Sequence, residues 1–337
     1  MDDINPLNGL QKCALALGTA TFSMADYSRF RKKSADQLRR QVILLSYSDF
    51  VDYDETTDEV TLKARLFDYT GARVEKQDYD NIRFVSAPEK SQPNALLDVR
   101  NFNLRIFGVE QIMISGKKKI AMEPREKQLV MMKNRDMSFE GKLRAGIFTM
   151  YGTNFFFSYD DYAIDLPQVD SARIFIAGEG EVQKQKIGSL IQNIKGKIVI
   201  DEPDNKSAQR ENPGFPVLHS SNESYVYFDD PSIRQGQYRR DSFYYRIEPY
   251  SIHGLDDPGR FSYAFAGTLI SNILPPIEDS LRLMDDNVLG LTLQCPEEGY
   301  PLYGEGRLFD RIVLNKQGFT AQGKVVVNRC TFYSDTI

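Results

Sequence analysis

The sequence predicts a mainly β fold, built as an extended antiparallel sheet or as a layered, solenoid-like β architecture with one short helix. Three observations support it. Aromatic residues make up 12% of the 337-residue chain, as 18 Tyr and 21 Phe without Trp, and such residues are enriched in strands. Many segments alternate apolar and polar residues with period two, which is typical of half-buried strands. Glycine and proline separate these segments at short intervals, as in turns.

The clearest strand signal lies in residues 138–147. One side of this segment carries apolar residues and glycine, and the other side carries charged residues. The first side holds Phe139, Gly141, Leu143, Ala145 and Ile147, and the second holds Glu140, Lys142 and Arg144. This alternation predicts a strand with one face in a core. An aromatic run follows at residues 155–162, and we interpret it as core packing rather than as a binding site.

The N-terminal part of the chain predicts shorter strands. Residues 12–31 and 36–53 alternate loosely, and we predict a strand in each. Residues 59–68 fit both the strand and the helix pattern, and we favour the strand. A polar segment with two prolines then separates this part from the rest. We therefore predict two regions, an N-terminal β-rich, mixed region at 1–85 and a β-rich region at 94–337.

Two segments of the second region differ from its strands. Residues 186–194 predict one helix of about two turns, because apolar residues recur there at helical spacing. These residues are Ile187, Leu190, Ile191 and Ile194. Residues 201–216 hold three prolines and many polar side chains, and loops of such length are either functional or disordered. If any part of the chain binds a ligand, we expect it to be this loop.

Short glycine-centred strings recur along the chain. The string Glu-Gly-Lys-Leu at 140–143 has relatives that begin at residues 195, 266, 305 and 322. A glycine inside a strand usually marks a bulge or a close approach of another backbone. We interpret each glycine as a position that faces a bulky aromatic residue on the next strand. The uneven spacing argues against a solenoid of fixed period.

Charge and hydropathy exclude several functional classes. The net charge is −5, from 42 basic and 47 acidic residues, which argues against nucleic acid or an anionic membrane surface as the main partner. No segment approaches 18 consecutive apolar residues, so we predict no membrane-spanning helix. The acidic start lacks the features of a secretory signal, and residues 325–334 have a strand pattern up to the end. We therefore expect the chain to be an excerpt of a longer protein.

The sequence predicts no catalytic, cofactor-binding or metal-binding residue. His219 and His253 lack partners at the usual ligand spacings, and the sequence contains neither a nucleophile elbow nor a nucleotide-binding loop. The cysteines Cys13, Cys295 and Cys330 form no C-x-x-C pair. A Cys295–Cys330 disulfide stays open as an alternative, although we favour free thiols.

Carboxylates leave an enzymatic function open. They occur as adjacent pairs at residues 160–161, 229–230, 256–257, 285–286 and 297–298. Opposed carboxylates across a groove would suit glycoside hydrolysis, but neighbours in a strand point to opposite faces, and acids in turns are common turn formers. A calcium loop made of Asp201, Glu202, Asp204 and Asn205 is a further alternative. Because it does not match the twelve-residue calcium loop, we favour a solvated acidic loop.

Three segments carry a resemblance to a known family. They are Ser138–Gly146, Asp201–Ser207 and Gly299–Gly306. Together with the chain from roughly residue 20 onward, they resemble a family of very long, uncharacterised bacterial proteins that are β-rich and associated with the cell envelope. The resemblance implies an architecture and a location in the periplasm or at the outer membrane. It implies no residue roles.

These observations lead to one expected function and two alternatives. We expect a non-enzymatic structural or assembly module of a large bacterial envelope protein, whose partners are other parts of that protein or other envelope proteins. The first alternative is a carbohydrate-binding or glycoside-active β protein, in which exposed tyrosines of 225–228 and 243–245 stack on sugar rings. The second is a β-sheet groove that shields lipid during transport.

Overall fold

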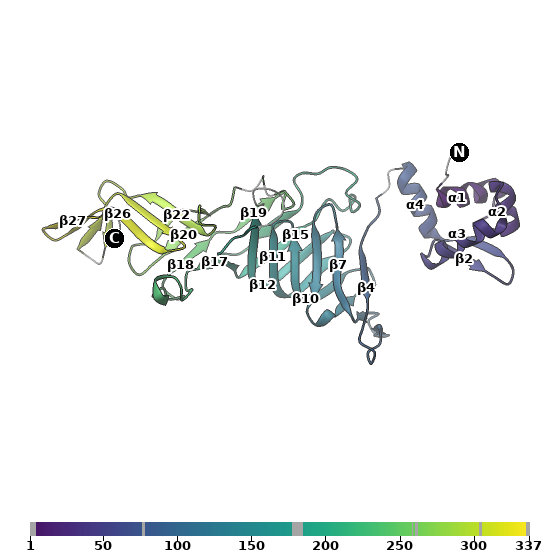
Figure 1. Ribbon diagram of the computed structural model, residues 1–337, viewed down its shortest axis with the longest axis horizontal. Helices are drawn as coiled ribbons and strands as arrows, with labels where there is room; N and C mark the ends of the chain where they lie inside the picture. The colour runs from purple at the N-terminus through teal and green to yellow at the C-terminus, as the bar shows by residue number, and fades with distance from the viewer. Residues whose placement is uncertain are drawn as a thin grey trace. The chain divides into compact units, whose positions relative to one another are not determined.

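The computed structural model describes residues 5–75, 78–176, 185–257, 259, 262–302 and 305–334. The chain is mainly β, as predicted, and it forms two compact units (Figure 1). Unit 1 comprises residues 1–80 and 204–209, and unit 2 comprises residues 81–203 and 210–337. Our predicted regions were 1–85 and 94–337. Each unit is described by itself below.

Unit 1 combines helices with a small antiparallel sheet. Its helices are α1 (Pro6–Leu17), α2 (Met24–Arg31), α3 (Ala35–Tyr47) and α4 (Ala64–Glu75), and its strands are β1 (Thr21–Ser23), β2 (Val51–Asp54) and β3 (Glu59–Leu62). The strands pair in the order β1-β3-β2. A three-residue turn joins α2 to α3, so the unit contains a helix–turn–helix followed by a β-hairpin. This unit has its own hydrophobic core.

The helices correct our N-terminal predictions. The strands predicted at 12–31 and 36–53 are confirmed only at 21–23 (β1) and 51–53 (β2), because α1, α2 and α3 take up most of both segments. Residues 59–68 are divided between β3 and α4. The Ser23 side chain accepts a hydrogen bond from the Asp26 backbone N–H and so caps the start of α2. In α3, Leu38 and Val42 are buried at a spacing of four residues. That helical period was present in the sequence, but the looser period-two pattern was given more weight.

Unit 2 is a connected series of strands in which every described pairing is antiparallel. Its first half consists of β4 (Arg83–Ser86), β5 (Ala95–Leu97), β6 (Leu104–Ile106), β7 (Val109–Ser115), β8 (Ile120–Pro124), β9 (Leu129–Met131), β10 (Met137–Ala145), β11 (Phe148–Ser158), β12 (Ala163–Ile176), β13 (Gln185–Lys186), β14 (Ile191–Gln192) and β15 (Ile194–Val199). Short 3-10 turns occur at Arg125–Lys127 and Arg234–Gly236.

The series continues beyond the long loop at 201–216. These strands are β16 (Val217–Ser220), β17 (Ser224–Tyr227), β18 (Tyr244–Ile247), β19 (Tyr250–His253), β20 (Ala264–Ile270), β21 (Ile277–Leu283), β22 (Leu289–Gln294), β23 (Tyr300–Leu302), β24 (Gly306–Leu308), β25 (Arg311–Asn315), β26 (Gly318–Val327) and β27 (Cys330–Ser334). Successive strands mostly lie next to each other, as in a meander.

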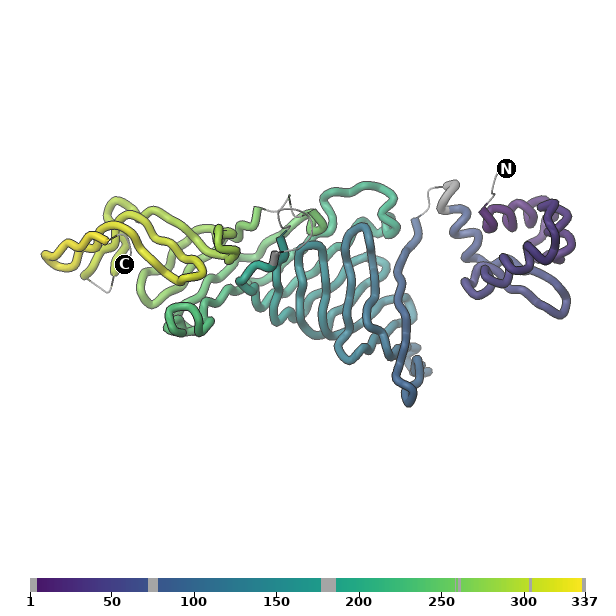
Figure 2. The backbone as a smooth tube through the Cα atoms, viewed as in Figure 1, coloured from purple at the N-terminus to yellow at the C-terminus, as the bar shows by residue number. Residues whose placement is uncertain are grey.

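The long strands bend, and shorter strands pair with each part of them. β10 pairs with β11 on one side, whereas on the other side it pairs with β8 through residues 141–145 and with β9 through residues 137–138. Register shifts mark bulges in the β10–β11, β11–β12 and β12–β15 pairs, and bulges increase local bending. The sheet therefore curves around its core, as the tube in Figure 2 shows.

The core of unit 2 lies on one face of these strands. In β10, Phe139, Leu143 and Ala145 are buried, whereas Glu140 is exposed. The predicted alternation at 138–147 is thus confirmed. Phe155 and Phe157 of β11 are fully buried in the same cluster, so the aromatic run serves packing. Burial of such apolar surface is the main favourable contribution to folding.

The helix predicted at 186–194 is wrong. This segment contains the last residue of β13, all of β14 and the first residue of β15. Ile187, Ile191 and Ile194 are fully buried there, so their spacing reflects burial along an irregular extended path. Asn193 adopts a left-handed backbone conformation with φ of 61° and separates β14 from β15. Asparagine tolerates this conformation better than most residues, and the bend imitates helical spacing.

The recurring glycines bring neighbouring backbones close together. A Cβ atom added at Gly141 would lie 2.5 Å from the carbonyl oxygen of Glu123, and one added at Gly196 would lie 1.8 Å from that of His219. The neighbour at these two positions is a strand carbonyl. Our interpretation that each glycine faces a bulky aromatic residue is therefore wrong for Gly141 and Gly196.

Candidate functional site

One margin of unit 2 ends in strands that have a single neighbour. Among the described strands, β4 pairs only with β7, and β5 pairs only with β6. β7 also pairs with β8, and β6 also pairs with β9. Both β8 and β9 pair with β10 on the side opposite to β11. Together β4 and β5 therefore form one margin of the sheet, which we call the open edge. An edge strand presents unpaired backbone N–H and C=O groups to a further strand.

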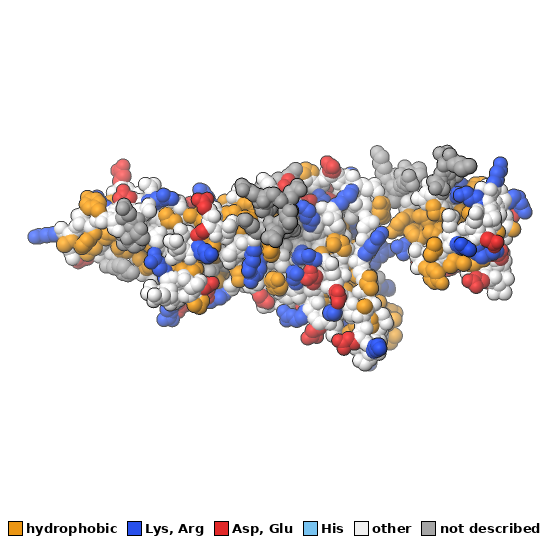
Figure 3. All heavy atoms as spheres, viewed as in Figure 1, with side chains coloured by type: hydrophobic (Ala, Val, Ile, Leu, Met, Phe, Trp, Pro, Cys, Tyr) orange, Lys and Arg blue, Asp and Glu red, His pale blue; other side chains and the backbone are white. Residues whose placement is uncertain are grey.

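Exposed apolar side chains gather along the open edge. They are Val85 (76% exposed), Leu96 (54%), Leu97 (56%), Val99 (74%), Phe102 (55%) and Met113 (38%). Soluble domains rarely leave a cluster of this kind uncovered. Charged side chains of both signs and apolar side chains are interspersed over the face of the molecule seen in Figure 3. Exposed large apolar residues occur elsewhere too, among them Leu44 on α3 and Tyr333 on β27.

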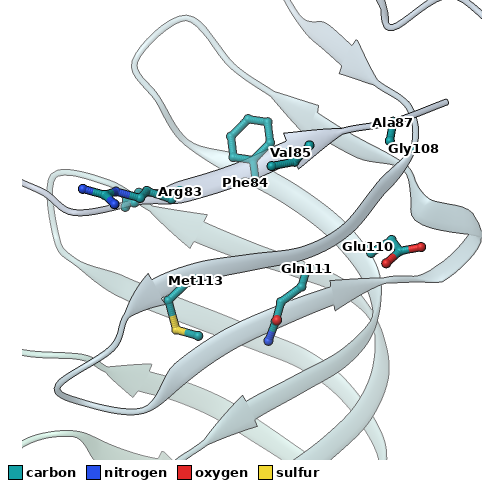
Figure 4. A pocket seen from close by; sticks show the side chains of 9 residues that line it. Arg83, Phe84, Val85, Ala87, Gly108, Glu110, Gln111 and Met113 are labelled. Atoms are coloured by element: carbon teal, nitrogen blue, oxygen red, sulfur yellow. The ribbon is translucent and has the colours of Figure 1, made fainter. Parts of the chain in front are cut away.

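The open edge contains two cavities. The larger, of about 660 Å3, is lined by Ile82, Arg83, Phe84, Val85, Ala87, Gly108, Glu110, Gln111 and Met113. Figure 4 shows side chains from β4 and from β7 around this space. The second cavity, of about 420 Å3, is lined by Leu96, Leu97, Asp98, Asn101, Asn103, Arg105 and Val130. Cavities of several hundred Å3 with mainly apolar walls are of a size that binds ligands or side chains of a partner.

The local sequence explains the exposure of Val85. Ile82 and Phe84 pack against the core of unit 2. The pairing of β4 with β7 shifts register between Phe84 and Ser86, which leaves Val85 outside the ladder. Beyond the bulge, the Ser86 hydroxyl donates a hydrogen bond to the Phe107 carbonyl at 2.8 Å. β4 is therefore firmly attached by one face and one edge while its other edge stays available.

An ion pair lies at the larger cavity, because Glu110 lines it. The Glu110 carboxylate lies 2.8 Å from the Lys127 ammonium group. The hydrogen bond and the charge of Lys127 lower the pKa of Glu110. Because both groups are largely exposed, the pair contributes little to stability. Apolar surface within a polar rim is the arrangement found at protein interfaces.

The loop at 201–216, which we expected to be the ligand-binding segment, is anchored by buried contacts. The Asp201 carboxylate is fully buried and lies 3.5 Å from the buried ammonium group of Lys118. Lys118 also donates hydrogen bonds to the carbonyls of Asn212 (2.6 Å) and Phe215 (3.1 Å). These contacts hold the start and the end of the loop close to Lys118. In the described part of the chain, no three His, Cys, Asp or Glu side chains gather in a way that would hold a metal ion.

The two histidines lie on neighbouring strands. The rings of His219 in β16 and His253 in β19 are 6.3 Å apart, and His219 Nδ1 is hydrogen-bonded to the Ser251 hydroxyl at 2.8 Å. Burial first, and then the charges of His253 and Lys197, lower the pKa of His219. Sequence spacing could not reveal this pair, because strand pairing brings together residues that are far apart in the chain.

The other sequence candidates are scattered. All five adjacent acid pairs lie in turns or loops.

The three cysteines are free thiols, with Cys13 buried, Cys295 half-buried and Cys330 exposed, so the disulfide alternative is wrong. Burial raises the pKa of Cys13 to about 11, which keeps its thiol protonated and unreactive at neutral pH.

Tyrosines form a second surface, on β17 and β18. Tyr225, Tyr227 and Tyr244 are half-buried, whereas Phe228, Phe243 and Tyr245 on the opposite face are buried. The three half-buried rings lie 5.9 to 6.1 Å apart between centroids. The sequence identified these residues as candidates but left their exposure open, because alternation does not show which face is covered.

Comparison with known proteins gives no match, whether to protein-family models, to curated proteins or to solved structures. No helix among the described residues is both long and apolar enough to cross a membrane.

Proposed function

We propose that this chain is a non-enzymatic assembly module of a large bacterial cell-envelope protein, and that it joins neighbouring β-structure by accepting a strand at the open edge. The observation that carries the proposal is the coincidence of unpaired backbone with exposed apolar side chains along β4 and β5. The envelope setting is supported by the resemblance of Ser138–Gly146 and the two later segments. Strand addition is a general way in which β proteins recognise extended segments.

The chemistry of the open edge defines the partner. Backbone groups of β4 and β5 would pair with any extended chain, so specificity must come from side-chain pockets. The two cavities lie over β4 with β7 and over β5 with β6 and β9, and their mainly apolar walls favour a partner strand with apolar side chains on the face that meets them. Natural edge strands are commonly protected by lysine, proline or charges that point inward. β4 and β5 are short and β4 carries a bulge, which limits unspecific pairing. The exposed apolar side chains of Leu96 and Leu97 nevertheless favour a covered edge in the working protein.

Self-association of the purified chain tests the proposal. In a sample that contains only this chain, the strands available to pair with the open edge are those of other copies. We expect reversible association at concentrations of about 10–100 μM, typical of a weak interface. Leu97→Lys combined with Val85→Lys should return the chain to a monomer, because two charges would be buried without partners. The weight-average mass from sedimentation velocity is the measurement.

Leu44→Lys is the matched control, because Leu44 is an exposed leucine (67%) on helix α3 rather than on a sheet edge. It should leave the association unchanged. A chain that stays monomeric at all concentrations would contradict the proposal. So would an association that Leu44→Lys abolishes and the two edge substitutions leave intact.

A further inference from the structure

Three tyrosines form a compact aromatic surface away from the open edge. Tyr225 and Tyr227 lie two residues apart on β17, and Tyr227 lies directly opposite Tyr244 on β18. The rings of Tyr225 and Tyr227 are within 20° of parallel. We call Tyr225, Tyr227 and Tyr244 the tyrosine surface. Aromatic rings carry negative charge on their faces and attract weakly positive C–H groups.

Polar groups around the tyrosine surface offer both donors and acceptors. The Tyr225 hydroxyl donates to the Glu223 carboxylate at 3.2 Å. The Arg240 guanidinium lies 3.8 Å from the ring centroid of Tyr227 and donates hydrogen bonds to Gln192 and to Asp229. Guanidinium, carboxylate and amide groups together match the mixed hydrogen-bonding needs of neighbouring hydroxyl groups.

The charges beside the tyrosine surface balance. Arg240 lies 3.4 Å from the Asp229 carboxylate, and Arg246 lies 3.6 Å from the Glu223 carboxylate. Each of these two cations is thus paired with an acid. Such a surface disfavours a polyanion, which needs uncompensated positive charge. It suits an uncharged ligand that combines C–H faces with hydroxyl edges.

We propose that the tyrosine surface binds uncharged glycan chains. A sugar ring would stack its C–H face on Tyr225 or Tyr244, and its hydroxyls would bond to Glu223, Gln192 and Arg240. The competing explanation is that cross-strand tyrosine pairs only stabilise the sheet. Removal of a ring should weaken glycan binding under the first explanation and should lower only the stability of the fold under the second. Glycan binding and stability must therefore be measured on the same variants.

The test uses the full chain and three soluble probes, namely maltohexaose, cellohexaose and chitohexaose, in titration calorimetry. Thermal unfolding of each variant is measured in parallel. We expect at least one probe to bind and Tyr225→Ala to weaken that binding by about tenfold, since one aromatic stack is worth about 1 kcal/mol. Tyr225→Phe keeps the ring and should retain most of the affinity.

Tyr333→Ala is the control, because Tyr333 is an exposed tyrosine (77%) on β27. It should leave the affinity unchanged. Failure of all three probes to bind to a folded chain would overturn the proposal, as would binding that survives Tyr225→Ala. Retention of the chain by proteins through Tyr225, with none of the three glycans bound, would also overturn it and assign the surface to a protein partner.

Discussion

Gly141 shows how one residue allows the sheet to bend. Its φ of 135° lies in a region that residues with a side chain rarely adopt. It faces the backbone at Glu123 and Arg125, where β8 ends and the following turn begins. The register of β10 against β11 also shifts between Phe139 and Gly141. The glycine therefore lets two backbones meet closely at the bend.

Replacement of Gly141 by alanine should destabilise the chain. The added methyl group would meet the Glu123 carbonyl, and the backbone would be strained, so we expect a loss of about 2–4 kcal/mol in the free energy of unfolding. Gly116→Ala is the control, since a Cβ atom there meets open space, and it should change stability by less than about 0.5 kcal/mol. Urea denaturation measures both. Equal effects would show that the bend does not depend on Gly141.

The lowered pKa of His219 predicts a pH dependence of stability. The folded state disfavours protonation of this ring, so the unfolded chain binds more protons just below its ordinary pKa of 6.5. The contribution of His219 is fully present above pH 6.5 and falls as the pH drops below that value. His219→Gln should therefore flatten the loss of stability as the pH drops below 6.5. Urea midpoints across this range are the measurement, and an unchanged slope would refute the role of His219.

At the scale of elements, the loop at 201–216 is an example of polar residues that serve structure. Lys118 follows β7 and reaches Asp201 at the start of the loop and two carbonyls near its end. A buried ion pair adds little net stability by itself, but its disruption leaves an unbalanced charge in the interior. Lys118 thus holds together the start and the end of the loop, both of which belong to unit 2.

Lys118→Ala should cost about 3–5 kcal/mol of unfolding free energy, because the cation beside the buried Asp201 carboxylate is removed. Lys119→Ala is the comparison, since Lys119 is exposed and bonds to the Asp256 carbonyl. We expect it to cost less than about 1 kcal/mol. Thermal or urea unfolding distinguishes the two. A similar small loss for both variants would show that the loop is held by other contacts.

The elements also show where sequence patterns are sufficient. The strand at 138–147 was predictable because its alternation is regular and one of its faces is buried. The helices of unit 1 were missed because a loose period-two pattern was given more weight than helical spacings such as that of Leu38 and Val42. The segment 186–194 was misassigned for the opposite reason, since a bend at Asn193 imitates helical spacing. Local patterns fail where burial is decided by distant strands.

At the scale of the whole molecule, the main result is that unit 2 has free margins. β4 and β5 form one margin, and β27 has β26 as its single neighbour among the described strands. Phe332 and Tyr333 are exposed on β27. No sequence pattern identifies an edge strand, because pairing depends on the complete topology. The candidate site was therefore hidden from the sequence, although the sequence led us to expect an assembly module.

Hydrogen exchange at the open edge tests the central claim most directly. Backbone amides of residues 83–86 and 95–97 should exchange more slowly as the concentration of the chain rises, because strand addition pairs them, while the amides of β11 stay unchanged. Mass spectrometry of peptic fragments gives both regions in one experiment. Association that leaves exchange at β4 and β5 unaltered would contradict the account, because the contact would then lie elsewhere.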